Sequence, residues 1–416
     1  AYELSIIGGG SFSNTNPLQL NNASSKLKLT GISASYVRTN SDSLGVVIDN
    51  SSSVNEFTVG HVTPVSISAN QSLDGVVDIY SNGNLQLNNS GTLSATVTVK
   101  GDAFGSGTVG GKIEVKETMT FSGSLQQTTD HNGLEIIIDS GKTMTYTGSG
   151  FNIENHTLKL SGGGEFKNTN NLSLNNSQSK LQLGGASISK VEINTSLTDG
   201  ELNISADSTI ESLSHTGTSR INLDANTSLT LTNPFEIPGS QTMEMVGTGT
   251  GRTVNLPDAL TLTGTLKISS ENYTFSSGTL KLNGGLLDVA ENTDFNTSID
   301  HLVSSSISVQ PQKTLKYAGD GLETGALTLT LSGGGIIENT NNLILDNPAS
   351  ILALNGISQI SGLSVTSALT SGKLSVGADA VIQTFEHTES SKLHISNNAS
   401  LTVQNVFEVP QNKSME

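Results

Sequence analysis

The sequence has no cysteine and no tryptophan, and aromatic residues make up only 4% of it. Without cysteine there is no disulfide framework, and neither a metal site nor a nucleophile can be built on a thiolate. So few aromatic rings argue against the thick core of a typical β-sandwich. The chain also lacks any apolar run of about 18 residues, the length needed to span a bilayer. We therefore expect no membrane insertion in this segment.

Positive charge is scarce as well. Lysine and arginine number 20 against 37 aspartates and glutamates, which gives a net charge of −17, and the only arginines are Arg38, Arg220 and Arg252. This balance argues against nucleic acid and against anionic membrane surfaces as partners. The charge amounts to about 0.04 per residue, too dilute to keep the chain unfolded by repulsion.

Three glycine triplets reveal a long internal repeat. They begin GGGSFSNTNPLQLNN (8–22), GGGEFKNTNNLSLNN (162–176) and GGGIIENTNNLILDN (333–347), so the copies are 154 and 171 residues long. The chain then holds about 2.5 copies, approximately 1–154, 155–325 and an incomplete 326–416. Such self-similarity is typical of arrays that stack short elements. We expect the chain to be an excerpt of a longer array.

Short apolar–polar–apolar triplets predict the secondary structure. Examples are LSL (172–174), LQL (181–183) and LKI (266–268), separated by Gly, Asn, Ser, Thr and Asp. Alternation with period two places both apolar side chains on one face of a strand, and the intervening residues favour turns. No segment has a sustained helical period, so the sequence predicts an all-β fold.

Strands this short favour a parallel β-helix, that is, a β-solenoid, because a narrow interior needs few large rings. We predict one continuous solenoid over residues 1–416, with two or three strands per coil and about 20–25 residues per coil. Each copy would be a block of about seven coils, and the difference in copy length would be absorbed in loops. The alternative is an array of β-sandwich domains.

Asparagine recurs with the long period, at Asn14, Asn168 and Asn339 and again at Asn22, Asn176 and Asn347. These positions could form a ligand-binding or glycan-bearing face. The favoured interpretation is structural, because asparagine adopts turn conformations easily and its amide can hydrogen-bond to like residues on neighbouring coils.

Histidine is the other candidate for chemistry. Asp130-His131 and Asp300-His301 occupy matching places and could form part of a metal site or hold an oriented imidazole, but solvated turn positions are favoured. His61, His215 and His387 also recur, and for them we expect surface or turn positions.

Catalysis is not expected. Enzymes on β-helices use clustered carboxylates, whereas Asp and Glu are scattered here, and a repeated chain multiplies features that an active site has once. The sequence thus predicts no enzyme and no catalytic, cofactor-binding or metal site.

The phrases LKLSGGGEFKNTNNLSLNN and LTLSGGGIIENTNNLILDN resemble the passenger regions of bacterial autotransporters and filamentous-haemagglutinin-like exoproteins. The resemblance implies a right-handed β-helix, export by a Gram-negative-type cell, and a role in adhesion, aggregation or surface architecture.

These observations predict a structural and adhesive segment of a large secreted bacterial repeat protein, a stiff stalk, fibre or filament at the cell surface. The partners would be other copies of the chain, joined end to end or laterally, and extracellular glycans or proteins. The alternatives are a polysaccharide-binding or polysaccharide-degrading β-helix protein and a phage-type fibre.

Overall fold

The structure is a computed structural model that describes residues 2–40, 42–43, 45–49, 52–80, 83–88, 90–100, 110–127, 133–153, 156–193, 201–368 and 373–416. Within these ranges every regular element is a β-strand and no residue is helical. The chain divides into two compact units, unit 1 (residues 1–211) and unit 2 (residues 212–416). The continuity of one solenoid over the whole chain stays a prediction.

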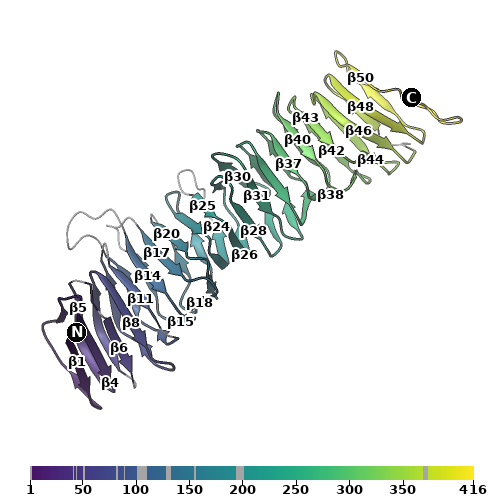
Figure 1. The fold of residues 1–416 in the computed structure, drawn as a ribbon. Helices are drawn as coiled ribbons and strands as arrows, with labels where there is room; N and C mark the ends of the chain where they lie inside the picture. Colours follow the sequence, from purple (N-terminus) through teal and green to yellow (C-terminus); the bar gives the residue numbers. More distant parts are fainter. Residues whose placement is uncertain are drawn as a thin grey trace. The chain divides into compact units, whose positions relative to one another are not determined.

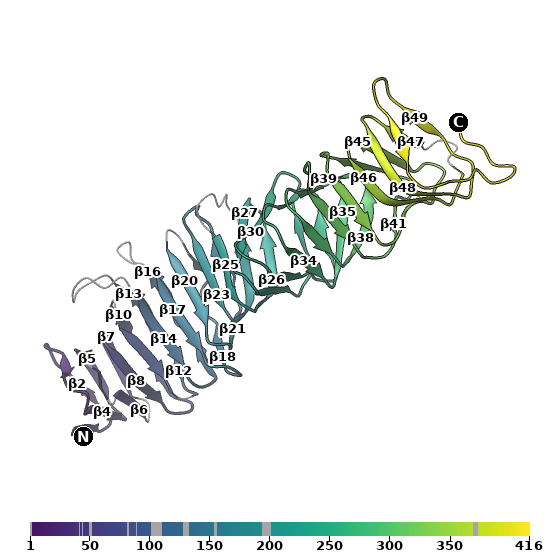
Figure 2. The same ribbon diagram turned by 45° about the horizontal axis from the view of Figure 1, so that its top comes forward.

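The strands pair in parallel with strands one coil away, not with their neighbours in sequence. In unit 1, β1 (Tyr2–Ile7) pairs residue by residue with β4 (Ser25–Thr30), and β4 pairs in turn with β6 (Gly45–Asp49). Figure 1 and Figure 2 show successive strands of this kind lying side by side, for example β14, β17 and β20. This parallel stacking confirms the β-solenoid, and the alternative of antiparallel sandwich domains is wrong.

In unit 1, three sheets cover the sides of the coils. Sheet A of unit 1 contains β1, β4, β6, β8 (Val62–Ile67), β11 (Asn84–Leu87), β14 (Gly111–Val115), β17 (Leu134–Ile138), β20 (Thr157–Ser161), β23 (Lys180–Gly184) and β25 (Glu201–Ala206). Sheet B contains β2 (Ser11–Phe12), β3 (Leu18–Leu20), β5 (Ser33–Thr39), β7 (Ser53–Val59), β10 (Val76–Ile79), β13 (Thr96–Val99) and β16 (Leu125–Gln127). Sheet C contains β9 (Ser72–Leu73), β12 (Thr92–Leu93), β15 (Met119–Phe121), β18 (Thr143–Tyr146), β19 (Phe151–Asn152), β21 (Glu165–Asn168), β22 (Leu172–Leu174) and β24 (Ser187–Ile193). The unit boundary falls within β26 (Ser208–His215).

Unit 2 repeats the plan. Its sheet A contains β27 (Ser219–Leu223), β30 (Thr242–Gly247), β33 (Thr265–Ile268), β36 (Leu286–Val289), β39 (Ser305–Val309), β42 (Thr328–Ser332), β45 (Ile351–Asn355), β47 (Lys373–Val376) and β49 (Leu393–Ile395). Its sheet C contains β28 (Ser228–Leu231), β31 (Arg252–Asn255), β34 (Tyr273–Ser276), β37 (Thr293–Phe295), β40 (Thr314–Tyr317), β41 (Leu322–Glu323), β43 (Ile336–Asn339), β44 (Leu343–Leu345), β46 (Gln359–Val365), β48 (Ala380–His387) and β50 (Leu401–Val403). Sheet D contains β29 (Phe235–Ile237), β32 (Leu260–Leu262), β35 (Thr279–Asn283) and β38 (Ser298–Val303).

The unit that repeats in space is one coil, so the prediction of 2.5 long repeats as structural units was wrong. Paired residues lie from 19 positions apart, as in Lys26 and Gly45, to 28 apart, as in Asn84 and Lys112. Among the described residues, copy one contributes seven strands to sheet A (β1, β4, β6, β8, β11, β14 and β17). Copy two contributes eight (β20, β23, β25, β27, β30, β33, β36 and β39). The longer copy therefore contains an additional coil, and the expectation that loops absorb the difference was wrong.

The apolar residues of the predicted triplets form the core. In β23, Leu181 and Leu183 are fully buried while Gln182 between them is half-buried. Because the strands pair in parallel, similar side chains stack on one another from coil to coil. Phe275 and Phe295, for example, are register partners, and their ring centres lie 4.6 Å apart. This continuous row of buried side chains replaces the single large core of a globular domain.

One charged side chain lies within this core. Arg252, at the start of β31, is 1% exposed, and its guanidinium lies 4.7 Å from the ring centre of Tyr273 on the next coil. Its Nη2 donates to the carbonyl oxygen of Glu271, whereas Nε and Nη1 have no protein partner in the described structure. Burial raises the pKa of the Tyr273 hydroxyl, which donates to the carbonyl oxygen of Val246.

Glycine and asparagine shape the corners, as the sequence predicts. Gly162 and Gly333 adopt φ of 97° and 98°, and a Cβ on either would lie 2.4 Å from a carbonyl oxygen of the preceding coil. The matching residues Asn70, Asn226 and Asn398 adopt the left-handed conformation, with φ of 63°, 56° and 65°. Asparagine tolerates that conformation better than other residues with a Cβ.

Candidate ligand-binding groove

The first set of recurring asparagines joins neighbouring coils. In unit 1, Asn168 Nδ2 donates to the carbonyl oxygens of Asn170 (2.8 Å) and Lys190 (2.7 Å), and Oδ1 accepts from the backbone N–H of Lys190 at 3.0 Å. Asn14 makes the same contacts to Tyr36 one coil on, and Asn339 makes them to Gly362. The role is structural, and the partner is the backbone of the next coil, not another asparagine side chain.

The second set forms turns. The Oδ1 atoms of Asn22, Asn176 and Asn347 each accept from the backbone N–H two residues ahead, at 2.8–2.9 Å. This is the side-chain turn that favours asparagine at corners. The turn interpretation is thereby confirmed for these three positions.

Two of the recurring histidines are buried, so the expectation of surface or turn positions was wrong for them. His215 is 3% exposed and His387 is 5% exposed. Their Nε2 atoms each lie 2.8 Å from a serine Oγ four residues on, Ser219 and Ser391. Burial lowers the pKa of His215 to about 4 and also lowers the pKa of His387, so both rings are neutral near pH 7.

A histidine next to a serine is the core of a nucleophilic site, but this pair has no route to a ligand. Ser219 is only 1% exposed, and His215 Nδ1 has no hydrogen-bond partner among the described residues, so no acid orients the ring. The pair therefore fastens the corner between β26 and β27. His61, by contrast, lies half-buried at a bend, as expected for it.

The Asp-His pairs do not form a metal site in the described structure. His301 lies on strand β38, not in a turn, and its Nδ1 donates to the carbonyl oxygen of Thr324 at 3.2 Å, while Asp300 is exposed. Burial lowers the pKa of His301. No group of three or more His, Asp or Glu residues that could hold a metal ion occurs within the described ranges. Asp130-His131 lies outside the described residues.

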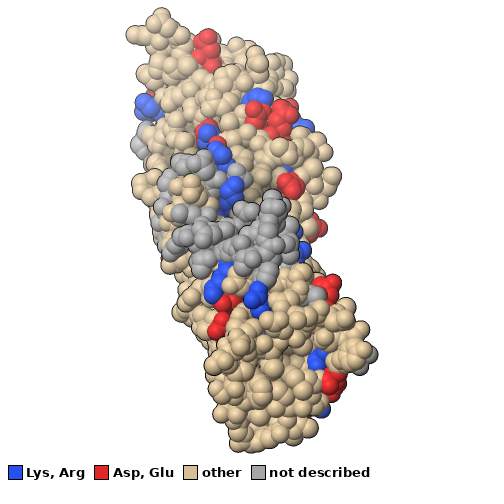
Figure 3. Space-filling model, turned by 90° about the vertical axis from the view of Figure 1, so that its left-hand side faces the viewer, with Lys and Arg blue, Asp and Glu red and all other residues tan. Residues whose placement is uncertain are grey.

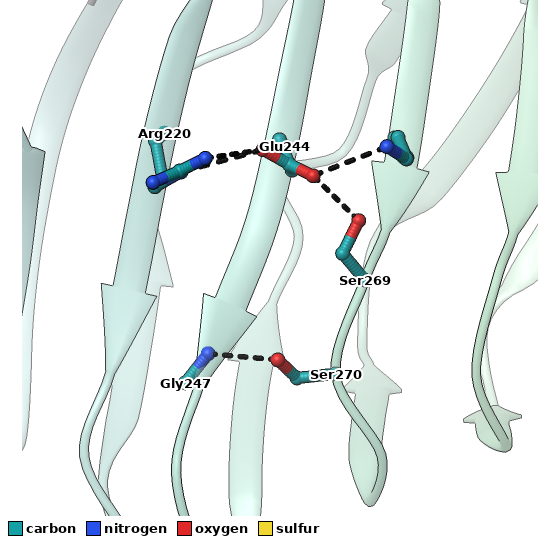
Figure 4. Close-up of polar contacts among 6 residues, drawn as sticks. Arg220, Glu244, Gly247, Ser269 and Ser270 are labelled. Atoms are coloured by element: carbon teal, nitrogen blue, oxygen red, sulfur yellow. Dashed lines mark hydrogen bonds and ion pairs between the residues drawn. The ribbon is translucent and has the colours of Figure 1, made fainter. Parts of the chain in front are cut away.

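Outward side chains of successive coils form charge rows. On sheet A of unit 2, Glu244 lies between Arg220 and Lys267, with an ion pair to each at 3.3 and 3.2 Å (Figure 4). Ser269 also donates its hydroxyl to Glu244 Oε1 at 2.6 Å. Burial acts to raise the pKa of Glu244, but Ser269, Lys267 and Arg220 together outweigh it and hold this pKa below its ordinary value.

Unit 1 has an equivalent row. Glu135 on β17 pairs with Lys112 at 3.2 Å and with Lys159 at 2.8 Å. On the face drawn in Figure 3, lysine and arginine atoms lie in small groups beside aspartate and glutamate atoms, and most of the drawn surface is uncharged. In these two rows, opposite charges one coil apart neutralise one another.

Unit 2 contains a groove where this pairing does not occur. It has a volume of about 440 Å³ and crosses β37, β40, β43, β46 and β48 of sheet C. It is lined by Asp294, Asn296, Lys316, Tyr317, Ala318, Glu338, Asn339, Thr340, Gln359, Ser361 and Gln383. A smaller hollow of about 310 Å³ shares Asp294 and Lys316 and continues toward β34.

The charged side chains of the groove are unpaired. Asp294, Lys316 and Glu338 are register partners on three successive coils, with the same alternation of charge as the Arg220–Glu244–Lys267 row. Within the described ranges, however, no ion pair or hydrogen bond engages their side chains. Lys316 and Glu338 are exposed, so these groups remain available to a ligand.

The residue that the coil-joining asparagine contacts on the next coil differs between the copies. The coil-joining Asn339 contacts Gly362, whereas the matching Asn168 contacts Lys190. In unit 1 the Lys190 Nζ donates to the carbonyl oxygen of Thr169 at 2.7 Å and so lies over the place that matches Thr340 in the groove. Gly362 has no side chain to reach this place, and Asn342 Oδ1 lies 2.1 Å from where its Cβ would stand.

The sequence did not single out the groove, because its residues differ between copies. Lys316 and Glu338 correspond to Thr145 and Lys167, so a search for recurring residues passes over them. Gly362 replaces Lys190 in a segment where the copies share few residues and are shifted by one position, so the sequence alone gave no signal there. The buried His-Ser pairs could have been found from HTGTS (215–219) and HTESS (387–391), which share serine at the fifth position.

Comparison with protein-family models, with curated proteins and with solved structures finds no match to this chain. Nothing within the described ranges forms a helix with the length and apolar character that crossing a membrane requires.

Proposed function

We propose that this chain is a structural and adhesive segment of a large secreted bacterial repeat protein that forms a stiff stalk, fibre or filament at the cell surface. The resemblance to autotransporter passengers and filamentous-haemagglutinin-like exoproteins supports this proposal. Its partners are other copies of the chain and extracellular glycans or proteins.

The observation that carries the proposal is the parallel stacking of coils, which places outward polar side chains in rows such as Lys112–Glu135–Lys159 and Arg220–Glu244–Lys267. Each row presents hydrogen-bonding side chains at the strand spacing, about 4.8 Å. Single contacts to such a surface are weak, but several contacts made together raise the effective affinity greatly. A solenoid thereby serves both as a spacer and as a multivalent surface.

The test measures adhesion as a function of surface density. Beads coated with the chain at increasing density are flowed over surfaces coated with polysaccharides or with epithelial cells. We expect adhesion to rise more steeply than in proportion to density, as multivalent binding requires. Beads that adhere no better than albumin-coated beads at any density would refute the adhesive role.

A second candidate, a polysaccharide-degrading enzyme, is favoured by one observation. Asp294 and Glu338 lie in the same groove two coils apart, which is about 10 Å along the stack and near the separation that inverting glycosidases use. Glu338 is exposed, however, and so lacks the apolar surroundings that suit a general acid. We expect no release of reducing ends from a panel of polysaccharides, and release that Glu338→Gln abolishes would favour the enzyme instead.

A further inference from the structure

The groove of unit 2 differs from the Arg220–Glu244–Lys267 row in being hollow and in leaving its charged side chains unpaired. We propose that it binds a neutral, unbranched oligosaccharide in an extended conformation, lying along the stack with about one sugar ring per coil. This inference deepens the adhesive function proposed above, because it names the ligand class of one site.

The polar groups of the groove suit a chain of hydroxyl groups. The carboxylates of Asp294 and Glu338 accept hydrogen bonds, Lys316 donates them, and Gln359 and Gln383 do both. Hydrogen bonds between a ligand and a charged side chain are among the stronger ones, provided that the side chain is not already paired with another protein group. The Arg220–Glu244–Lys267 row fails this condition, and the groove meets it.

The spacing of the coils fits an extended sugar chain. Strands of a parallel sheet lie about 4.8 Å apart, close to the length of one ring in a β-1,4-linked chain. The groove crosses five strands of sheet C, or about 19 Å, which is room for about four rings. An α-1,4-linked chain curves away from such a straight row and would meet fewer coils.

Charge and ring content narrow the ligand class further. Two carboxylates against one lysine give the row Asp294–Lys316–Glu338 a net negative charge, which disfavours uronate and sulfated polysaccharides. Tyr317, the one aromatic residue of the lining, is 2% exposed, and its hydroxyl donates to the carbonyl oxygen of Asp320 at 2.6 Å. Without an exposed ring to stack on, the site is weak and depends on multivalency.

Gly362 follows the lining residue Ser361 and offers a way to block the groove. A Cβ here would approach Asn342 Oδ1 at 2.1 Å, the end of a half-buried side chain that can turn away. The φ of Gly362 is not positive, and the matching residue of unit 1 is a lysine, so this backbone tolerates a side chain. Gly362→Lys therefore tests the groove by restoring the residue that unit 1 carries.

The experiment is an NMR titration of the full chain with cellotetraose, followed at the amides of Thr340 and Ser361. We expect saturable shifts with Kd in roughly the millimolar range, as suits a shallow site made of a few hydrogen bonds. Lys316→Ala and Gly362→Lys should each weaken binding about tenfold or more. Lys167→Ala changes an exposed lysine of unit 1 and serves as the matched control, with no expected effect.

Several results would overturn the proposal. One is the absence of chemical-shift changes with cellotetraose. Another is a loss of affinity in Lys167→Ala equal to that in Lys316→Ala. A third is that maltotetraose or tetragalacturonate binds as tightly as cellotetraose. Because Lys316 is exposed, its substitution keeps the test valid even if Gly362→Lys folds poorly. If wild-type and Gly362→Lys beads adhere equally to a polysaccharide surface, the groove proposal fails while the adhesive function stands.

Discussion

Asn168 offers the sharpest test of how one coil is fastened to the next. Its side chain is 2% exposed and makes three hydrogen bonds, two as donor and one as acceptor. A hydrogen bond contributes about 0.5–1.5 kcal/mol net, so Asn168→Ala should lower the stability of unit 1 by about 2–4 kcal/mol. The loss of stability is at the upper end of this range if water cannot hydrogen-bond to the backbone groups of Lys190 that the substitution leaves without a partner.

The matched control is Asn176→Ala. Its Oδ1 accepts one hydrogen bond, at 2.9 Å from the N–H of Gln178 within the same turn. This substitution should cost less than about 1 kcal/mol, because a single local bond is lost and solvent can replace it. Asn168→Asp keeps the acceptor but turns a charged oxygen toward two carbonyl oxygens. It should therefore be less stable than Asn168→Ala at pH 7 and should recover as the pH falls and the new carboxyl becomes protonated.

The assay is hydrogen exchange read by mass spectrometry, because stacked coils open locally and one unfolding midpoint does not describe them. Exchange at the Lys190 amide and in the peptides of β21 and β24 reports the opening of this pair of coils. If Asn168→Ala costs no more than Asn176→Ala and the Lys190 amide stays protected, the side chain does not hold the coils together. The structural interpretation of the recurring asparagines would then be refuted.

Three further predictions concern unit 2. The pKa of His215 is about 4 in the folded state against about 6.5 unfolded, so protonation favours the unfolded chain. The free energy of unfolding of unit 2 should keep its full value above pH 6.5 and fall by about 3 kcal/mol as the pH falls to 4. Urea titrations measure this loss. The prediction is contradicted if His215→Gln shows the same pH dependence. Glu244→Gln should lower stability by about 1 kcal/mol or less, because the partners of Glu244 are partly exposed. Urea titrations should show that the difference in stability between wild type and Glu244→Gln shrinks in 1 M salt. Arg252→Met should leave stability unchanged or raise it, because removing a partly unpaired guanidinium from water costs free energy. A clear loss of stability in urea denaturation would show instead that the contact of Arg252 with Tyr273 dominates.

The strands, the core and the corners of this fold were predictable from the sequence. The alternation in segments such as LQL (181–183) already decides which side chains are buried, because the strand period is a local property of the backbone. The turn residues Asn176 and Asn226 were predictable for the same reason, since an asparagine turn depends on the two or three residues that follow. These features need no knowledge of what lies on the next coil.

Other features depend on the next coil, about 22 residues away, and only the tertiary structure decided them. His215 has small and polar neighbours in sequence, yet the stacking of coils leaves it only 3% exposed. The additional coil of copy two became visible only when strands could be assigned to sheets. The groove likewise depends on which residues of β37, β40, β43, β46 and β48 the stack brings side by side. A one-dimensional pattern specifies the direction of each side chain, but which side chain lies above it is fixed by the register between coils.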